Sequence, residues 1–196
     1  MNSDIEIIGV EMPTSYGEFK LYGFSNGEDQ YKPNLVLIKG EDFQGKAPLV
    51  RVHSECLTGD VFSSQRCDCG DQLKHAIELI EKEGEGAVLY LRQEGRGIGL
   101  FEKLKAYKLQ EKGYDTVDAN LMLGHESDSR DYEFAAELLK YFGISKIRLI
   151  TNNILKVEGI EKYGIKVEER IPSIMPLNKF NSKYMNTKKN RMQHIL

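Results

Sequence analysis

The sequence has only three cysteines among its 196 residues, Cys56, Cys67 and Cys69, and no Cys-x-x-Cys pair. It has no apolar run long enough to cross a membrane. Its N-terminus, MNSDIEIIGVEM, has acidic residues early and no basic segment, so it is not typical of a secretory signal. These absences argue against a disulfide framework and a transmembrane helix. They predict a cytoplasmic protein whose cysteines are free or bind metal.

The sequence also has no excess of positive charge. The formal net charge is -3, and the 40% hydrophobic and 29% charged residues are ordinary for a globular protein. We therefore expect neither a nucleic acid nor a membrane as partner, although a local basic site for a small anion is compatible with this composition.

The spacing of apolar residues alternates between strand-like and helix-like segments. Alternation or short apolar runs predict strands at 17–24, 35–39, 49–53, 87–91, 146–151 and 165–169. Helical spacing predicts helices at 71–83, 100–112, 131–142 and from about 152 to 163. This pattern predicts an α/β (mixed α+β) fold, in which helices pack on a mixed sheet.

Two segments need separate interpretation. The polar, glycine-containing stretch between 35–39 and 49–53 predicts a hairpin-like connection between those strands. Residues 1–177 are expected to form a single catalytic domain. The segment 178–196 is rich in Asn and Lys without a clear period, so it is either a flexible tail or a helix that orders on substrate or a partner.

The cysteines form one short C-x10-C-x-C cluster. A structural zinc site usually has four protein ligands, whereas a catalytic zinc keeps three and a water whose pKa falls to about 7. The polar surroundings, QRCDCGDQ, disfavour three incidental core thiols. The sequence therefore predicts a zinc hydrolase with Cys56, Cys67 and Cys69 as ligands. A closed structural site with His53 or His75 as fourth ligand is the alternative.

Longer motifs surround this cluster and follow it in order. They are RVHSECLTGDVFSSQRCDCGDQL (51–73), LRQEGRGIGL (91–100), KGYDTVDAN (112–120), SDSRDY (127–132) and RLITNNILKVEGI (148–160). With them the sequence resembles GTP cyclohydrolase II, which opens the guanine imidazole ring at the start of riboflavin synthesis. The resemblance covers about residues 13–196. It implies conversion of GTP and water to 2,5-diamino-6-hydroxy-4-(5-phosphoribosylamino)pyrimidine, formate and pyrophosphate.

The resemblance also implies roles for individual residues. Asp128 would be the proton acceptor, Arg130 the nucleophile toward the α-phosphate, and Tyr107 a group near the guanine ring. Substrate contacts are implied at Arg51, Val52, His53, Ser54, Glu55, Gln72, Glu94, Gly95, Arg96, Thr116, Thr151 and Lys156. One zinc ion per chain, magnesium with the triphosphate or pyrophosphate, and a homodimer are implied as well.

Chemistry qualifies some of these roles. The pKa of arginine stays above about 12, so Arg130 suits electrostatic clamping of phosphate better than nucleophilic attack. Without the resemblance, Asp128 and Arg130 would be a surface pair, and Tyr107 would pack on its helix. Glu94 could accept hydrogen bonds from guanine N1–H and the amino group. For His53, a structural role is as compatible as a catalytic one.

The sequence departs from the family pattern at one site motif. Ile154 stands where many members have proline in TNNPKK, which should alter the start of a helix more than the chemistry. We also expect no companion synthase domain of the kind that some relatives carry. Two other functions stay open: a zinc-stabilised binding module without catalysis, and a related enzyme that stops at the formamide intermediate.

Overall fold

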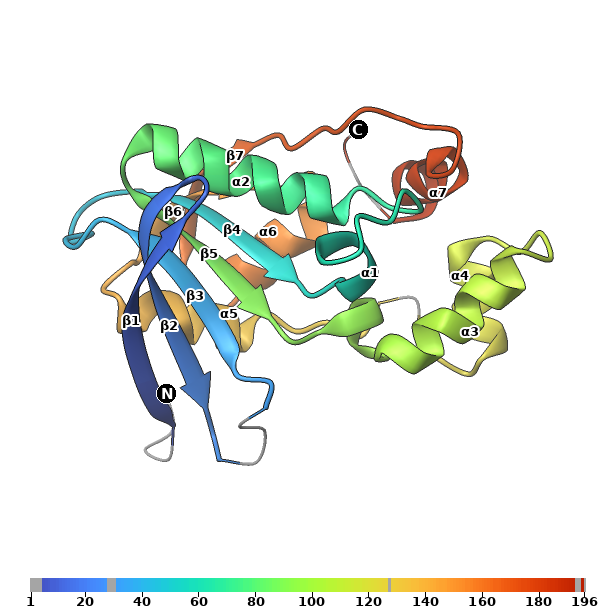
Figure 1. The fold of residues 1–196 in the computed structure, drawn as a ribbon, viewed down its shortest axis with the longest axis horizontal. Helices are drawn as coiled ribbons and strands as arrows, with labels where there is room; N and C mark the ends of the chain where they lie inside the picture. The colour runs from blue at the N-terminus through green and yellow to red at the C-terminus, as the bar shows by residue number, and fades with distance from the viewer. Residues whose placement is uncertain (1–4, 28–30, 127, 193–194, 196) are drawn as a thin grey trace.

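A seven-stranded mixed sheet forms the centre of the computed structural model, which describes residues 5–27, 31–126, 128–192 and 195 (Figure 1). Its strands are β1 (Glu6–Thr14), β2 (Gly17–Ser25), β3 (Asn34–Lys39), β4 (Leu49–Ser54), β5 (Gly86–Leu91), β6 (Lys146–Ile150) and β7 (Lys166–Ile171). Their order in space is β1-β2-β3-β5-β4-β6-β7. The pairs from β1 to β5 are antiparallel, and those from β5 through β4 and β6 to β7 are parallel.

Helices pack on both faces of this sheet (Figure 1). They are α1 (Leu57–Asp60), α2 (Cys69–Glu83), η1 (Glu94–Gly97), α3 (Leu100–Gln110), α4 (Thr116–Met122), α5 (Glu133–Tyr141), α6 (Ile154–Glu161) and α7 (Ser182–Arg191). Ala76 and Ile80 of α2 pack on one face. Leu138 and Leu139 of α5 and Ile160 of α6 pack on the other. The expected mixed sheet with packed helices is confirmed.

The predicted strands and helices all occur, with small differences at their ends. The prediction of a hairpin-like connection between 35–39 and 49–53 is wrong, because β5 lies between β3 and β4 in the sheet. β4 runs parallel to β5 and reaches it through α2, and parallel strands need such a crossover. Five of the six residues of β4 are buried, as expected for a strand covered by helices on both faces.

Five elements were not among those predicted from the sequence. They are β1, which pairs with β2 at the sheet edge, the short helices α1, η1 and α4, and α7. The sequence is compatible with either a flexible tail or a helix at residues 178–196. In the structure, ten of these residues form α7. The domain boundary at residue 177 stays a prediction. Within the described ranges, none of the helices is long and apolar enough to span a membrane.

The parallel part of the sheet creates a natural crevice at the carboxyl end of β4. From β4 the chain passes through α2 on one face to β5, and it later enters β6, on the other side of β4, from α5 on the opposite face. Ligands of open α/β sheets bind where neighbouring connections diverge in this way. Cys56, Glu94 and Thr151 follow β4, β5 and β6 at this edge, so chemistry-bearing loops converge there.

Candidate functional site

The three cysteines converge at the carboxyl end of β4. Cys56 precedes α1, and Cys69 is the first residue of α2. Their sulfur atoms lie within 4.8 Å of one another, and the Cys56 and Cys67 sulfurs are 3.7 Å apart. A tetrahedral zinc with Zn–S bonds of about 2.3 Å requires sulfurs about 3.8 Å apart. The cluster therefore fits a zinc ion held by three thiolates.

Neither histidine proposed as a fourth ligand belongs to this cluster in the described part of the chain. His53 is buried, and its Nε2 lies 3.0 Å from a carboxylate oxygen of Asp60. Burial lowers the pKa of His53, and the hydrogen bond to Asp60 only partly offsets this effect. Asp60 also accepts from the Cys56 amide at 2.9 Å and from the Tyr90 hydroxyl at 2.8 Å. His53 thus belongs to a buried network behind Cys56.

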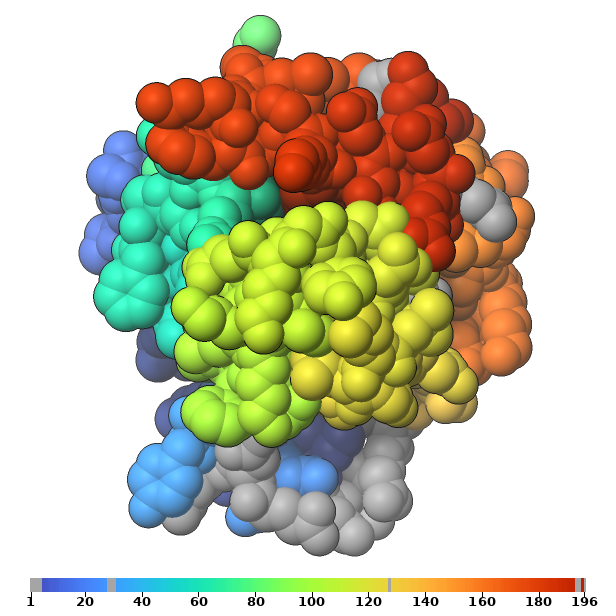
Figure 2. Space-filling model, turned by 90° about the vertical axis from the view of Figure 1, so that its right-hand side faces the viewer, coloured from blue at the N-terminus to red at the C-terminus, as the bar shows by residue number. Residues whose placement is uncertain are grey.

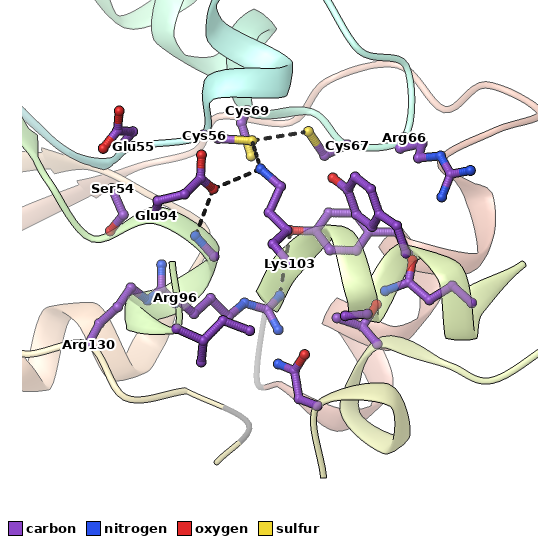
Figure 3. A pocket seen from close by; sticks show the side chains of 18 residues that line it. Ser54, Glu55, Cys56, Arg66, Cys67, Cys69, Glu94, Arg96, Lys103 and Arg130 are labelled. Carbon is purple, nitrogen blue, oxygen red and sulfur yellow. Dashed lines mark hydrogen bonds and ion pairs between the residues drawn. The ribbon is translucent and has the colours of Figure 1, made fainter. Parts of the chain in front are cut away.

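A lysine and a glutamate border the sulfur cluster (Figure 3). Lys103 Nζ lies 3.3 Å from Cys56 Sγ and 2.7 Å from Glu94 Oε1. Glu94 Oε1 also accepts from the Gly95 amide, and its Oε2 accepts from the Leu57 amide at 2.7 Å. Burial lowers the pKa of Lys103, but Cys56, Tyr107 and Glu94 together raise it by more, so the net shift is upward. The Lys103 ammonium is therefore placed to stabilise a thiolate.

A cavity of about 110 Å³ opens in front of the sulfurs (Figure 3). Tyr107 of α3 lines it, and the centre of its ring lies 4.8 Å from the guanidinium carbon of Arg66 and 5.8 Å from Lys103 Nζ. Burial raises the pKa of Tyr107 to about 12. The phenol is therefore protonated at neutral pH and can donate a proton or a hydrogen bond.

A second cavity of about 70 Å³ adjoins the first, and basic side chains dominate it. Its cationic residues are Arg51, Arg96, Arg130, Lys156 and Lys188. The two cavities adjoin, and we refer to them as the sulfur end and the cationic end of one site. The residues that line both are Ser54, Cys69, Arg96, Arg130 and Tyr184. Such a concentration of buried positive charge favours a polyanionic ligand.

Arg51 and Lys156 each donate a hydrogen bond to a backbone carbonyl. Arg51 donates to the Ile150 carbonyl at 3.0 Å and to Gln72 Oε1 at 2.6 Å. Lys156 is buried on α6 and donates to the Val52 carbonyl at 2.6 Å. Burial lowers the pKa of Lys156 well below its usual value, and the charges of Arg51 and Arg130 lower it further.

Asp128 and Arg130 form a two-pronged ion pair beside the cationic cavity. Arg130 Nε and Nη2 lie 2.8 and 2.5 Å from the two oxygens of Asp128. Burial raises the pKa of Asp128, but hydrogen bonds and charge from Arg130 more than offset this, so the net shift is downward. Burial lowers the pKa of Arg130, but the hydrogen bonds and charge of Asp128, together with Tyr132 and Tyr184, outweigh burial, so the net shift is upward. Both groups are thus charged at neutral pH.

The loop after β5 is strained where it meets both cavities. Arg96 has φ of 64°, a left-handed conformation that is uncommon for a residue with a side chain. Gly95 and Gly97 on either side also have positive φ. This turn directs Arg96 into the wall that both cavities share (Figure 3). Strain of this kind concentrates at functional sites.

The structure gathers nearly all residues expected in the site. In addition to the cysteines, Tyr107 and the residues already described, the lining includes Ser54, Glu55, Gly95 and Thr116 of the sulfur cavity and Gln72 and Thr151 of the cationic cavity. Val52 lies in the core and reaches the site only through its carbonyl. Asp128 faces a separate depression with Arg130. Most of the expected site residues therefore lie around the same two cavities, while their individual roles stay predictions.

Sequence analysis missed Lys103, Asp60, Tyr184 and Lys188. Lys103 is one of three lysines on α3, and Asp60 follows Cys56 without any known ligand spacing. Tyr184 and Lys188 belong to α7, whose sequence has no clear apolar period. Their environment is set by contacts distant in sequence, so a local pattern could not have identified them.

Comparisons with known proteins agree with this geometry. The chain is 53% identical over 192 residues to the riboflavin biosynthesis protein RibBA of Phocaeicola vulgatus, covering 96% of this chain and 46% of that protein. It is 51% identical over 189 residues to the RibBA protein of Bacillus cereus strain B4264, covering 96% and 47%. The chain thus spans about half the length of these curated relatives.

A solved structure and a family model complete the comparison. The structure, described as RibBX, a two domain 3,4-dihydroxy-2-butanone 4-phosphate synthase from A. baumannii, is 17% identical with a TM-score of 0.49, over 86% of this chain and 40% of that chain. The model of GTP cyclohydrolase II matches residues 6–172. Since this match spans most of the chain and contains the cysteine cluster, the chain belongs to the GTP cyclohydrolase II family.

Proposed function

We propose that this chain is a zinc-dependent GTP cyclohydrolase II. It converts GTP and water to 2,5-diamino-6-hydroxy-4-(5-phosphoribosylamino)pyrimidine, formate and pyrophosphate. The observation that carries the proposal is the adjacency of two unlike cavities, one beside three sulfurs and one lined by five basic side chains. A nucleoside triphosphate has the same asymmetry, with a base at one end and phosphates at the other. The base would therefore lie beside the sulfurs.

The sulfur end is suited to hydrolysis of the imidazole ring. Cys56, Cys67 and Cys69 would hold the zinc ion, which when bound supplies a Lewis acid that lowers the pKa of water. Ring opening at C8 requires a proton on the departing ring nitrogen. Tyr107 carries such a proton at neutral pH, because its pKa is raised to about 12. We assign Tyr107 as the proton donor to the base.

At the phosphate end, Arg130 would bind the α-phosphate electrostatically. Its raised pKa and its two bonds to Asp128 keep the guanidinium charged and oriented. A charged guanidinium stabilises charge that develops on phosphate oxygens, whereas nucleophilic attack would first require loss of a proton. Asp128 is the group placed to accept that proton. Arg51 and Lys156 would neutralise the remaining phosphates together with magnesium.

Several expected contacts would act through neighbours. Gln72 orients Arg51, and the Val52 carbonyl orients Lys156. Glu94 already accepts three hydrogen bonds from the chain, so guanine would have to use its remaining lone pairs. We therefore propose that Glu94 chiefly positions Lys103 beside the cluster, and its pairing with guanine stays a prediction.

A zinc-stabilised binding module is the second candidate. It requires a fourth protein ligand, and no histidine or carboxylate of the described residues lies within the cysteine cluster. Removal of the metal separates the two functions. A catalytic zinc should leave the fold largely intact while activity is lost, whereas a structural zinc should unfold the domain.

The direct test uses the zinc-loaded full chain with GTP and magnesium. Formate, pyrophosphate and the diaminopyrimidine should form in equal amounts, and Cys67→Ser should abolish formate release. An enzyme that stops at the formamide would release pyrophosphate without formate. Absence of both products from zinc-loaded protein would contradict the proposal. A homodimer and a cytoplasmic location stay predictions.

A further inference from the structure

Helix α7 lies beyond residues 6–172, which the family model matches, yet it borders the site. Figure 2 shows the C-terminal segment, in red, lying against the yellow-green region of α3 and α4. Lys188 Nζ lies 2.5 Å from a carboxylate oxygen of Asp68, which stands between two of the cysteines. The helix is thus attached directly to the metal-binding loop.

Two further contacts tie the C-terminal segment to the site. Arg191 bonds to Asp115 and, at 2.9 Å, to Asp118, on either side of Thr116. The Ile195 amide donates to the Asn152 carbonyl at 2.9 Å, beside Thr151. Each attachment point is therefore adjacent in sequence to a residue that lines one of the cavities.

Two α7 side chains reach the cavities themselves. Tyr184 lines both of them, and its hydroxyl accepts from Arg96 Nη2 at 3.5 Å. Lys188 lines the cationic cavity and is 6% exposed, with Nζ 4.8 Å from the centre of the Tyr184 ring. An ammonium has three donors, and Asp68 is the one carboxylate that binds it among the described residues.

The cavities also contain donors that lack acceptors. Arg51 Nε and Arg96 Nη1 are buried without a hydrogen-bond partner among the described residues. A buried donor without a partner is costly, and the cost is greater for a charged group. An anion with several oxygens, seated between Arg51, Arg96 and Lys188, would satisfy these donors together.

We propose that Lys188 and Tyr184 of α7 are substrate-binding residues, and that Lys188 binds the polyphosphate of the nucleotide while it retains Asp68. This inference rests on the proposed function, because it takes a nucleoside polyphosphate as the ligand. It makes the phosphate end of the site incomplete without the C-terminal helix. The alternative role for Lys188 is that of an anchor that only holds α7 in place.

Binding of inorganic tripolyphosphate to the zinc-loaded full chain, measured by calorimetry, tests the inference without ring opening. Lys188→Met should weaken binding by about tenfold or more, as expected for loss of a charged hydrogen bond. The matched control is Lys189→Met, which removes the same charge from an exposed position on the same helix and should bind as the wild type does. Equal affinities of the two variants would overturn the inference.

Two further variants separate substrate contact from anchoring. Arg191→Met removes another anchor of α7 and should change tripolyphosphate affinity by less than threefold; a loss equal to that of Lys188→Met would overturn the inference. Lys188→Met leaves the buried carboxylate of Asp68 without its ion-pair partner. A double variant, Lys188→Met with Asp68→Asn, removes this unpaired negative charge. The double variant should fold with the thermal midpoint of the wild type and still bind weakly. If the double variant bound tripolyphosphate with wild-type affinity, direct contact between Lys188 and the polyphosphate would be contradicted.

The assays also distinguish failure of this inference from failure of the proposed function. Tripolyphosphate binding that depends on Lys188, without formate release from GTP by the wild type, would contradict the cyclohydrolase function alone. Formate release with a KM for GTP that is unchanged in Lys188→Met would contradict the inference alone. We expect Lys188→Met to raise KM for GTP by about tenfold.

Discussion

Gly70 lies so close to Gly59 that a β-carbon on Gly70 would overlap the Gly59 carbonyl oxygen. A β-carbon on Gly59 would in turn lie 3.1 Å from Cys67 Sγ and 3.3 Å from Cys56 Sγ. Neither glycine has a positive φ, so close approach is what requires glycine here. This contact joins α1 to the first turn of α2 and brings Cys56 and Cys67 within 3.7 Å.

We predict that Gly70→Ala destabilises the protein by about 1–3 kcal/mol, because the added methyl group forces α1 and α2 apart. Zinc affinity should fall at the same time, since the sulfur positions shift. Gly23→Ala is the control, because its β-carbon would meet neighbours at 3.7 Å or more. Urea unfolding with and without zinc measures both effects. Equal behaviour of the two variants would contradict this role of the glycine contact.

Lys103→Met should weaken zinc binding by about 10- to 100-fold, as loss of a group that supports a metal ligand typically does. The substitution removes the ammonium that lies 3.3 Å from Cys56 Sγ and leaves Glu94 without its ion-pair partner. Competition with a chelator measures the affinity. Lys105→Met, at an exposed position of the same helix, is the control and should bind zinc normally. Similar losses in both variants would show that overall charge, and not the Cys56 contact, is responsible.

Zinc binding near pH 6 should release about two protons per ion, because two of the three ligand thiols are protonated beforehand and a zinc-bound water with a pKa of about 7 stays largely protonated. Hydrogen bonds from Cys67 and Cys69 and the charge of Lys103 lower the pKa of Cys56. The pKa values of Cys67 and Cys69 are raised, with the bond to the Cys56 thiolate as the first cause. A pH indicator in weakly buffered solution measures the release. Release of about three protons by the wild type would mean that Cys56 is not a thiolate beforehand.

Lys156 should make stability depend on pH. Burial lowers its pKa in the folded state, whereas the unfolded chain keeps a value near 10.5. The unfolded state therefore binds more protons between these values, and stability is lost as pH falls through that window. Relative to Lys156→Met, the wild type should gain roughly 1 kcal/mol per pH unit as pH rises within it. Urea unfolding from pH 7 to 10 measures this.

Pyrophosphate provides the internal control for that experiment. Bound close to Lys156, an anion favours the charged ammonium and raises its pKa in the folded state. The difference in pH dependence between wild type and Lys156→Met should therefore shrink when pyrophosphate is present. An unchanged slope would place Lys156 away from the phosphates.

The sequence alone determined the family and most of the secondary structure, and it predicted the metal-binding chemistry. Apolar periodicity is local, so helices such as 71–83 and strands such as 87–91 follow from neighbouring residues. All three cysteines and the flanking RVHSE segment likewise lie within residues 51–69, and the sequence has no fourth cysteine. These features indicated zinc and GTP before any tertiary contact was known.

Only the tertiary structure decided the order of strands and the environment of each site residue. The sequence suggested a hairpin-like link from 35–39 to 49–53, but β5 lies between those strands and pairs with β4 in parallel. The contacts of Lys103 with Cys56 and of Lys188 with Asp68 span 47 and 120 residues. Contacts across such separations depend on how the layers pack, so no local pattern encodes them. The same packing, through Gly59 and Gly70, brings the cysteines together as one cluster that could hold a metal.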